Sequence, residues 1–241
     1  MKENNSNQKG NLHVNFLVLD GETCNTPKID GQLDVKNGQV YDLGGMVINE
    51  YGEEKTRFSF VNSDVFFGMP NQMREAYFSD KIPQYIKDIN MGIRQVLNTW
   101  QIWKRIRQIC KEYNVQAIVA HNAYFDITTL NATLRYQTKS FKRYFLPYKM
   151  KVIDSLKIAR KVFGKDPNYI KFCQDNGYMT NTTKPRPRLT AEVLWRYISN
   201  NPEFIESHTG LEDVEIESKI FAACLEKIRF KRHLTSLKKV V

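Results

Sequence analysis

The apolar run NFLVL, residues 15–19, is followed at once by two carboxylates with one glycine between them, Asp20 and Glu22. The run is short and unbroken, so it predicts a buried strand. Residues i and i+2 of a strand lie on the same face, which places Asp20 and Glu22 side by side at the strand end. Adjacent carboxylates repel each other and raise one pKa unless a positive charge intervenes. The pair therefore indicates a divalent cation, although an isolated pair of this kind is more often two solvated loop acids.

Strand and helix patterns alternate along the rest of the chain. Two strands joined by a short turn should pair antiparallel, and a strand reached through a helix should run parallel to the first. Residues 64–95 are expected to form short helices and loops that cap one end of the sheet. The predicted main elements are strands at 15–19, 40–49, 55–61, 115–120 and 151–154, a helix over 94–113, a helix from about Ile127, and further helices to the C-terminus. This order predicts a mixed α/β sheet flanked by helices, with three antiparallel strands followed by parallel ones.

The helix over 94–113 is predicted from apolar residues at helical spacing. These residues are Val96, Trp100, Trp103, Ile106 and Ile109. The spacing favours a place in the core for both tryptophans, and not a platform for nucleotides.

A second acidic motif, HNAYFD at 121–126, follows the strand 115–120. Asp126 falls near the start of the next helix, at the sheet edge where open α/β sheets place their sites. It would there approach Asp20 and Glu22. The alternative is that Asp126 caps the helix. His121 and Asn122 fit equally well a turn that hydrogen-bonds its own backbone.

A third motif, ESHTGLED, begins at residue 206. Thr209 and Glu212 have the spacing of a capping box, which makes Thr209 the N-cap and puts Asp213 in the first helical turn. His208 then lies just outside the helix, so His208 and Asp213 can face one point. Asp213 is a candidate metal ligand and His208 a candidate base. The alternative is a surface helix start with a solvated histidine.

The three motifs D-G-E-T, H-N-A-Y-F-D and H-x-x-x-x-D together resemble the DEDDh branch of the DnaQ-like 3′–5′ exonucleases, of the RNase T and DNA polymerase III proofreading type. They follow the family's order, and the resemblance spans about residues 14–225. Tyrosine-type relatives carry Tyr where this chain has Thr209, whereas His208 takes the histidine-type place. Gly21 and the segment 62–95 depart from the family's usual pattern.

This resemblance implies an RNase H-like fold with a five-stranded mixed sheet, and two bound Mg²⁺ or Mn²⁺ ions. Asp20 would bridge both ions, Glu22 and Asp213 would hold the first, and Asp126 the second. His208 would deprotonate the attacking water. Thr23 and Asn122 would lie against the terminal nucleotide, and Asp154 is expected to be a helix cap and not a further ligand.

The net charge of +10, with a pI near 9.3, favours an anionic partner. Three basic segments, 135–145, 184–188 and 228–239, fit a groove for single-stranded nucleic acid. We expect DNA in preference to RNA, although no feature of the sequence reads the 2′-hydroxyl. The four cysteines are far apart and predict reduced thiols in a cytoplasmic protein. No apolar stretch is long enough for a membrane span, and the N-terminus does not look like a secretory signal. We expect a flexible tail at 1–13, one exonuclease domain at 14–228 and a basic tail at 229–241.

These observations lead to one main hypothesis, a metal-dependent 3′–5′ exonuclease that releases nucleoside monophosphates from single-stranded DNA in proofreading or repair. An RNA-trimming exonuclease is the nearest alternative, because the sequence does not show how a 2′-hydroxyl would be recognised. A non-catalytic nucleic-acid-binding module of the same fold is a third. A DNA polymerase would be a further partner if the chain serves as a proofreading subunit.

Overall fold

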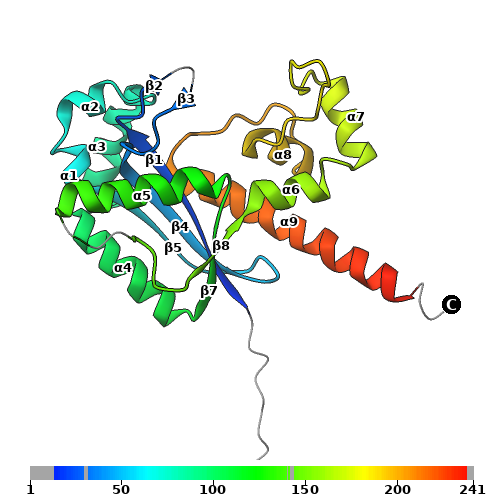
Figure 1. The fold of residues 1–241 in the computed structure, drawn as a ribbon, viewed down its shortest axis with the longest axis horizontal. Coiled ribbons are helices and arrows are strands. Elements are labelled where there is room, and N and C mark those ends of the chain that lie inside the picture. The colour runs from blue at the N-terminus through cyan, green and yellow to red at the C-terminus, as the bar shows by residue number, and fades with distance from the viewer. Residues whose placement is uncertain (1–13, 30–31, 140, 142–143, 238–241) are drawn as a thin grey trace, which may run out of the picture.

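The computed structural model describes residues 14–29, 32–139, 141 and 144–237, so the predicted N-terminal tail at 1–13 lies outside the described residues. Within them, a six-stranded sheet with the order β6-β5-β4-β1-β7-β8 forms the centre of the molecule (Figure 1). Its strands are β1 (Asn15–Cys24), β4 (Gln39–Asn49), β5 (Glu54–Asn62), β6 (Gln95–Leu97), β7 (Val115–Ala120) and β8 (Lys151–Asp154). The two short strands β2 (Lys28–Ile29) and β3 (Gln32–Leu33) pair with each other outside this sheet.

The strand directions confirm the predicted topology. β1, β4 and β5 pair antiparallel, whereas β1, β7 and β8 pair parallel. β1 is longer than predicted, because β4 supplies backbone partners for it as far as Cys24. Asp20 and Glu22 therefore lie inside the strand, opposite Gly44 and Asp42 of β4, and a bulge follows Glu22.

The sixth strand corrects two expectations, the strand count of five and the start of the helix predicted over 94–113. The helix α4 (Thr99–Glu112) begins later, because Asn98 caps it in a capping box with Gln101. The residues before this cap form β6, which runs parallel to β5 and pairs with Phe60–Asn62. Val96 thus belongs to an edge strand and not to the apolar face of the helix.

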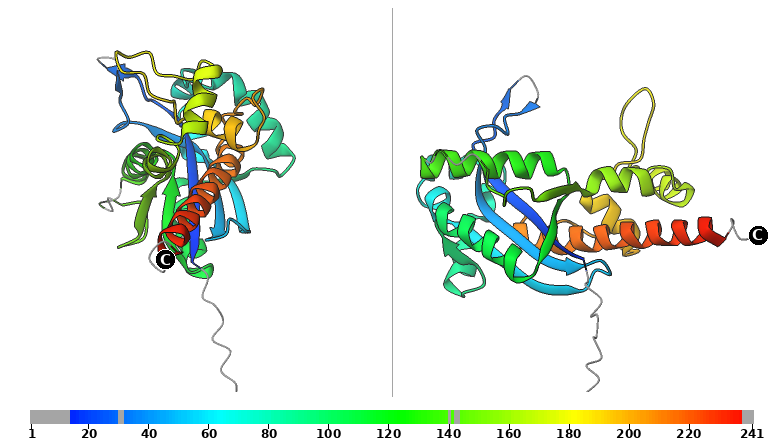
Figure 2. Two further views of the ribbon diagram at one scale, coloured as in Figure 1. Left: turned by 90° about the vertical axis from the view of Figure 1, so that its right-hand side faces the viewer. Right: turned by 60° about the horizontal axis from the view of Figure 1, so that its bottom comes forward.

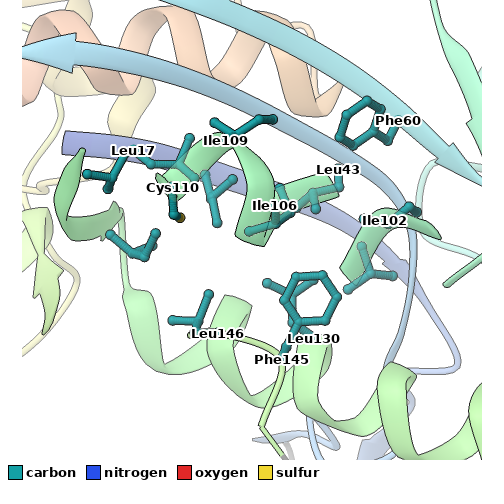
Figure 3. Packing of buried hydrophobic residues seen from close by; sticks show 14 of the residues in the cluster. Leu17, Leu43, Phe60, Ile102, Ile106, Ile109, Cys110, Leu130, Phe145 and Leu146 are labelled. Atoms are coloured by element: carbon teal, nitrogen blue, oxygen red, sulfur yellow. The ribbon is translucent and has the colours of Figure 1, made fainter. Parts of the chain in front are cut away.

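Helices cover both faces of the sheet. α4 and α5 (Ala123–Thr138) pack on one face, where Leu17 and Leu19 of β1 belong to the core cluster of Figure 3. Trp100 and Trp103 stack on each other with ring centroids 4.6 Å apart and are half-buried, so they pack against the edge of this cluster and are not part of it, in contrast to the predicted core position. α9 (Gly210–Leu237) packs on the other face, against Phe16 and Val18.

The alternation along β1 decides where its acids point. Odd-numbered residues such as Leu17 and Leu19 face α4 and α5, whereas Phe16 and Val18 face α9. Because successive side chains of a strand alternate between faces, Asp20 and Glu22 belong to the α9 face.

The remaining helices form two groups. α1 (Ser63–Phe66), α2 (Pro70–Arg74), the 3₁₀ turn η1 (Ser79–Lys81) and α3 (Ile82–Asn90) cap one end of the sheet, as predicted. α6 (Ser155–Val162), α7 (Pro167–Asp175) and α8 (Ala191–Ile198) share a second core with α9. Figure 2 shows α9 as one long helix that runs well beyond the sheet.

The predicted domain boundary at residue 228 falls inside α9, which continues to Leu237. Residues 238–241, the end of the predicted basic tail, lie outside the described residues. Among the helices of the described residues, none combines the length and the apolar character that a membrane crossing requires.

Candidate active site

Three carboxylates meet where β1 passes beneath the start of α9. Asp20, Glu22 and Asp213 each offer one ligand oxygen, and these atoms all lie within 4.8 Å of one another. The first two share a face of β1, and Asp213 lies in the first turn of α9, as predicted. The capping box predicted there does not form, because the Thr209 hydroxyl donates to the Glu212 carboxylate. Carboxylate oxygens at this spacing can share one divalent cation.

Two glycines let α9 approach the sheet this closely. Gly44 of β4 touches Gly210 of α9 backbone to backbone, so a Cβ on Gly44 would lie 2.1 Å from the carbonyl carbon of Gly210. The Gly210 N–H donates a hydrogen bond of 2.9 Å to Asp42 Oδ2, which satisfies one of the unpaired donors at the helix N-terminus. The first turn of α9 is thereby fixed over β4, and Asp213 is held beside Asp20.

A buried arginine neutralises the acid that anchors α9. Asp42 Oδ2 also accepts hydrogen bonds from the Tyr85 hydroxyl at 2.7 Å and from Arg94 at 3.2 Å. Arg94 is 3% exposed, and it also contacts Asp88 at 3.0 Å and Glu212 of α9 at 3.3 Å. A buried charge needs such partners, since an unpaired one costs several kcal/mol. The segment 64–95 and the start of α9 are tied together through this network.

Asp126 lies in the first turn of α5 and does not cap the helix. The N-cap position is Asn122, in the left-handed conformation at φ 71° and without a side-chain cap. Asp126 is buried, and its Oδ1 has no hydrogen-bond partner. Burial and the charge of Asp20 raise the pKa of Asp126 well above its ordinary value. Asp154, in contrast, caps α6 by accepting a hydrogen bond from the Lys157 N–H, as predicted.

Glu217 is an acid of this site that the sequence analysis missed. It lies on α9 one turn after Asp213, and the i, i+4 spacing of the two acids is the signal that would have pointed to it. Its side chain is 5% exposed, and its Oε2 has no hydrogen-bond partner. Burial first, and then the charges of Asp20 and Asp126, raise the pKa of Glu217 well above its ordinary value.

The cluster is electrostatically costly in the absence of cations. Burial together with Glu206 and Asp42 raises the pKa of Asp20 to about 7. Burial together with Asp20 raises the pKa of Glu22 to about 10 and that of Asp213 to about 9. Among the described residues, no lysine or arginine lines the cavity that these acids share.

This donor set fits divalent metal ions. The ligands are hard carboxylate oxygens, which Mg²⁺ and Mn²⁺ favour. Several of the buried oxygens have no hydrogen-bond partner, namely Asp126 Oδ1, Asp213 Oδ1 and Glu217 Oε2. Buried oxygens of this kind are costly unless a ligand satisfies them.

His208 lies beside the acids, outside the helix. Its backbone is left-handed at φ 54°, a conformation in which histidine is enriched, and α9 begins two residues later. The ring stacks on Phe78 with centroids 4.5 Å apart, and Nδ1 lies 3.9 Å from Glu206 Oε2. Burial and the nearby charge of Lys81 lower the pKa of His208. Phe78 and Glu206 carried no sequence signal that pointed to the site.

A cavity of about 770 Å³ joins these groups. Its lining includes Asp20, Glu22, Asp213, Glu217, His208, Glu206, Thr23, Tyr77, Phe78 and Phe125. Neither Asp126 nor Asn122 lines it. Asn122 lies instead in an adjacent groove of about 820 Å³, whose lining includes Glu206 and Glu217 as well. The structure thus brings Thr23 to the acids and places Asn122 in the neighbouring groove.

The chain has the RNase H-like fold of the DEDDh 3′-exonucleases. The nuclease domain of 3′hExo, a DEDDh family member bound to rAMP, matches with a TM-score of 0.54 and 12% identity, over 90% of this chain and 94% of its own. A full-length 3′-exonuclease matches with a TM-score of 0.55 and 13% identity, over 89% and 82% of the two chains. E. coli Exonuclease I in a complex with single-stranded DNA matches with a TM-score of 0.52 and 16% identity, over 94% of this chain and 43% of its own.

At sequence identities of 12–16%, these structural matches show a shared fold and nothing about activity. This chain spans less than half the length of Exonuclease I. Comparison with protein-family models and with curated protein sequences finds no match.

Proposed function

We propose that the chain is a metal-dependent 3′–5′ exonuclease, which hydrolyses single-stranded DNA from its 3′ end and releases nucleoside monophosphates. One observation carries this proposal. Acids from β1, α5 and α9 interact within one partly buried cluster, beside a histidine that belongs to none of these elements. Such a cluster opposes folding by its own repulsion, and acids with strongly perturbed pKa values beside a cavity are typical of functional sites.

We propose two Mg²⁺ or Mn²⁺ ions as the resident cofactors. Asp20, Glu22 and Asp213 would hold the first ion, while Asp126 would hold the second together with Asp20. We add Glu217 to the second group, because its free Oε2 and its charge interaction with Asp126 place it among these acids. When bound, such ions activate the attacking water and stabilise the leaving oxygen of the phosphodiester.

His208 is proposed as the general base that accepts the proton of this water. Its lowered pKa keeps the ring neutral, and therefore able to accept a proton, at neutral pH. Nδ1 faces Glu206, so we assign the proton transfer to Nε2. The stack on Phe78 restricts the rotation of the ring and holds it toward the cavity.

The terminal nucleoside is proposed to occupy the cavity in front of the acids. Its walls carry Tyr77, Phe78 and Phe125, aromatic rings of the kind on which bases stack, and Thr23 offers a hydroxyl. A volume of about 770 Å³ lies in the range of small-molecule sites. A cavity that holds one nucleoside favours a single strand, because a duplex end must first be unstacked at a cost of a few kcal/mol.

The proposal takes DNA as the substrate and proofreading or repair as the setting, with a DNA polymerase as a further partner. Exonuclease I is seen with single-stranded DNA, whereas a 3′-exonuclease that matches this fold recognises the 3′ end of a histone mRNA stem-loop. RNA is therefore the competing substrate in the test.

The test uses purified full-length protein with Mg²⁺ or Mn²⁺ and oligonucleotides labelled at the 5′ end. A ladder that shortens one nucleotide at a time is the expected result, and chelation of the metal should abolish it. Immediate release of labelled mononucleotide would mean attack from the 5′ end, and cleavage of a circular single strand would mean an endonuclease. Either result would refute the proposal, whereas faster decay of RNA would refute the choice of DNA.

A further inference from the structure

Three arginines line the groove that adjoins the acid cavity. Arg160 comes from α6, whereas Arg186 and Arg188 come from the segment between α7 and α8. The groove shares Glu206 and Glu217 with the cavity, so the two spaces meet at the acids. Asn122 also lines the groove.

The segment that carries Arg186 and Arg188 is held by backbone hydrogen bonds. Thr180 N–H donates to the Arg186 carbonyl at 2.8 Å, and Arg188 N–H donates to the Tyr178 carbonyl at 2.9 Å. Pro185 and Pro187 alternate with the arginines and fix φ at both positions. The arginines are therefore presented from an ordered turn, which lowers the entropy lost when they bind a ligand.

The far end of this segment is tied to the strand that leads into the site. The carbonyl of Leu189 accepts a hydrogen bond of 2.8 Å from His121 Nε2, and the Tyr169 hydroxyl donates one of 2.6 Å to the Arg188 carbonyl. His121 directly follows β7 and precedes the helix that carries Asp126. The position of the arginines relative to the acids is thus set by hydrogen bonds.

The guanidinium groups of these arginines are exposed and have no carboxylate within ion-pair distance among the described residues. Two other arginines behave differently, since Arg94 and Arg196 are paired with acids. Three unpaired cations along one groove attract an anionic ligand, and the planar guanidinium binds phosphate with two hydrogen bonds.

We propose that this groove binds the backbone phosphates of the nucleotides that lie 5′ of the scissile bond in a single-stranded polynucleotide. The inference rests on the proposed function, which places the terminal nucleoside in the aromatic cavity and the scissile phosphate at the acids. A strand in that position continues past Glu206 and Glu217 into the groove. Arg160, Arg186 and Arg188 then act as phosphate contacts without preference for sequence.

The experiment measures binding as a function of strand length and salt. Fluorescence anisotropy would follow a labelled 12-nucleotide single-stranded DNA and a labelled dinucleotide, on full-length protein in an Asp20→Asn background that prevents hydrolysis. The test variant is Arg160→Ala/Arg186→Ala/Arg188→Ala. The control variant, Lys55→Ala/Lys104→Ala/Arg105→Ala, removes the same charge from exposed residues that do not line either space.

We expect the test variant to bind the 12-nucleotide strand about 10- to 100-fold more weakly, since each exposed ion pair contributes a modest factor. The slope of log affinity against log salt concentration should become shallower by about 2 in the test variant, because each phosphate contact on a single strand contributes about 0.7 to this slope. Affinity for the dinucleotide should change far less. The control variant should retain both the affinity and most of the salt dependence.

Equal losses in the test and control variants would overturn the groove proposal and leave only a general effect of net charge. Tighter binding of a 12-base-pair duplex than of the single strand would also overturn it. Failure of the proposed function would be seen in a different measurement, as the absence of hydrolysis by the unmodified protein. The binding measurement tests the groove in either case.

Discussion

Replacing Gly44 with alanine should separate the two halves of the proposed metal site. Gly44 lies on β4 opposite Asp20, on the sheet face that α9 covers. A Cβ at this position would lie 2.1 Å from the carbonyl carbon and oxygen of Gly210 and 2.4 Å from the Leu211 nitrogen. These are backbone atoms, so no rotation of a side chain relieves the overlap.

The size of the effect follows from this geometry. Ordinary van der Waals contact begins at 3.4 Å, so the start of α9 must move away from β4 by about 1.3 Å. Overpacking of this kind typically lowers the free energy of unfolding by about 1–3 kcal/mol. Because Asp213 moves with α9, the three ligand oxygens also lose their spacing. A misplacement of about 1 Å can lower activity about 10²-fold, and we expect a loss of that order, with weaker metal binding.

The neighbouring Gly45 provides the matched control. A Cβ on Gly45 would lie 2.0 Å from the Phe58 ring, a contact with a side chain and not with α9. Gly45→Ala should therefore lower the free energy of unfolding, while metal affinity and nuclease activity in the folded protein stay close to normal. Urea denaturation gives the stability, calorimetry the metal affinity, and the oligonucleotide assay the activity. Normal metal affinity and activity in Gly44→Ala would refute the conclusion that this glycine contact sets the position of Asp213.

Three further predictions concern single groups of the site. His208→Ala should lower turnover about 10²- to 10⁴-fold, while metal affinity measured by calorimetry stays unchanged; an equal loss of metal affinity would make His208 a ligand instead. Glu217→Gln should weaken metal binding roughly 10- to 100-fold, and it should raise the melting temperature of the metal-free protein only at a pH above the raised pKa of Glu217, where the carboxylate of the unmodified protein is charged; unchanged metal affinity would contradict its place in the second ion's site. The free energy of unfolding of the metal-free protein should fall as the pH rises from about 5 to 9. The pKa is raised to about 7 for Asp20 and to about 9 for Asp213, so the folded state binds more protons than the unfolded state in this range. Urea denaturation with a chelator measures this pH dependence, which Asp20→Asn should make shallower; a free energy of unfolding that rises with pH would contradict the prediction.

The acids that the sequence predicted share one property, because a local sequence pattern determines the position of each in its strand or helix. Asp20 and Glu22 follow from the period of a strand, and Asp213 follows from the capping pattern at Thr209. The parallel pairing of β7 with β1, which brings Asp126 toward the same edge, follows from the helix between the two strands. Each of these rules needs a few neighbouring residues and the general handedness of α/β connections.

The features that the sequence missed depend on contacts between distant segments. β6 exists because the edge of β5 accepts Gln95–Leu97, whereas the apolar spacing around Val96 favoured a helix. Phe78 reaches His208 across more than a hundred residues of chain. Arg94 lies in a segment without any motif, and its role depends on the burial of Asp42. Local pattern carries no information about such pairs.

The same contacts explain how a cluster of buried acids persists before any cation binds. Repulsion among Asp20, Asp126 and Asp213 acts to separate β1, α5 and α9, the elements that carry them. β1 is held on both sides by strands, so it cannot move alone. α9 is held by backbone contact at Gly210 and by Asp42, whose own charge is balanced by Arg94. With the frame fixed, protonation of the acids relieves the repulsion in the metal-free protein, and metal binding must then release protons. Proton release on addition of Mg²⁺, measured in a weakly buffered solution near pH 7, is therefore expected to accompany binding.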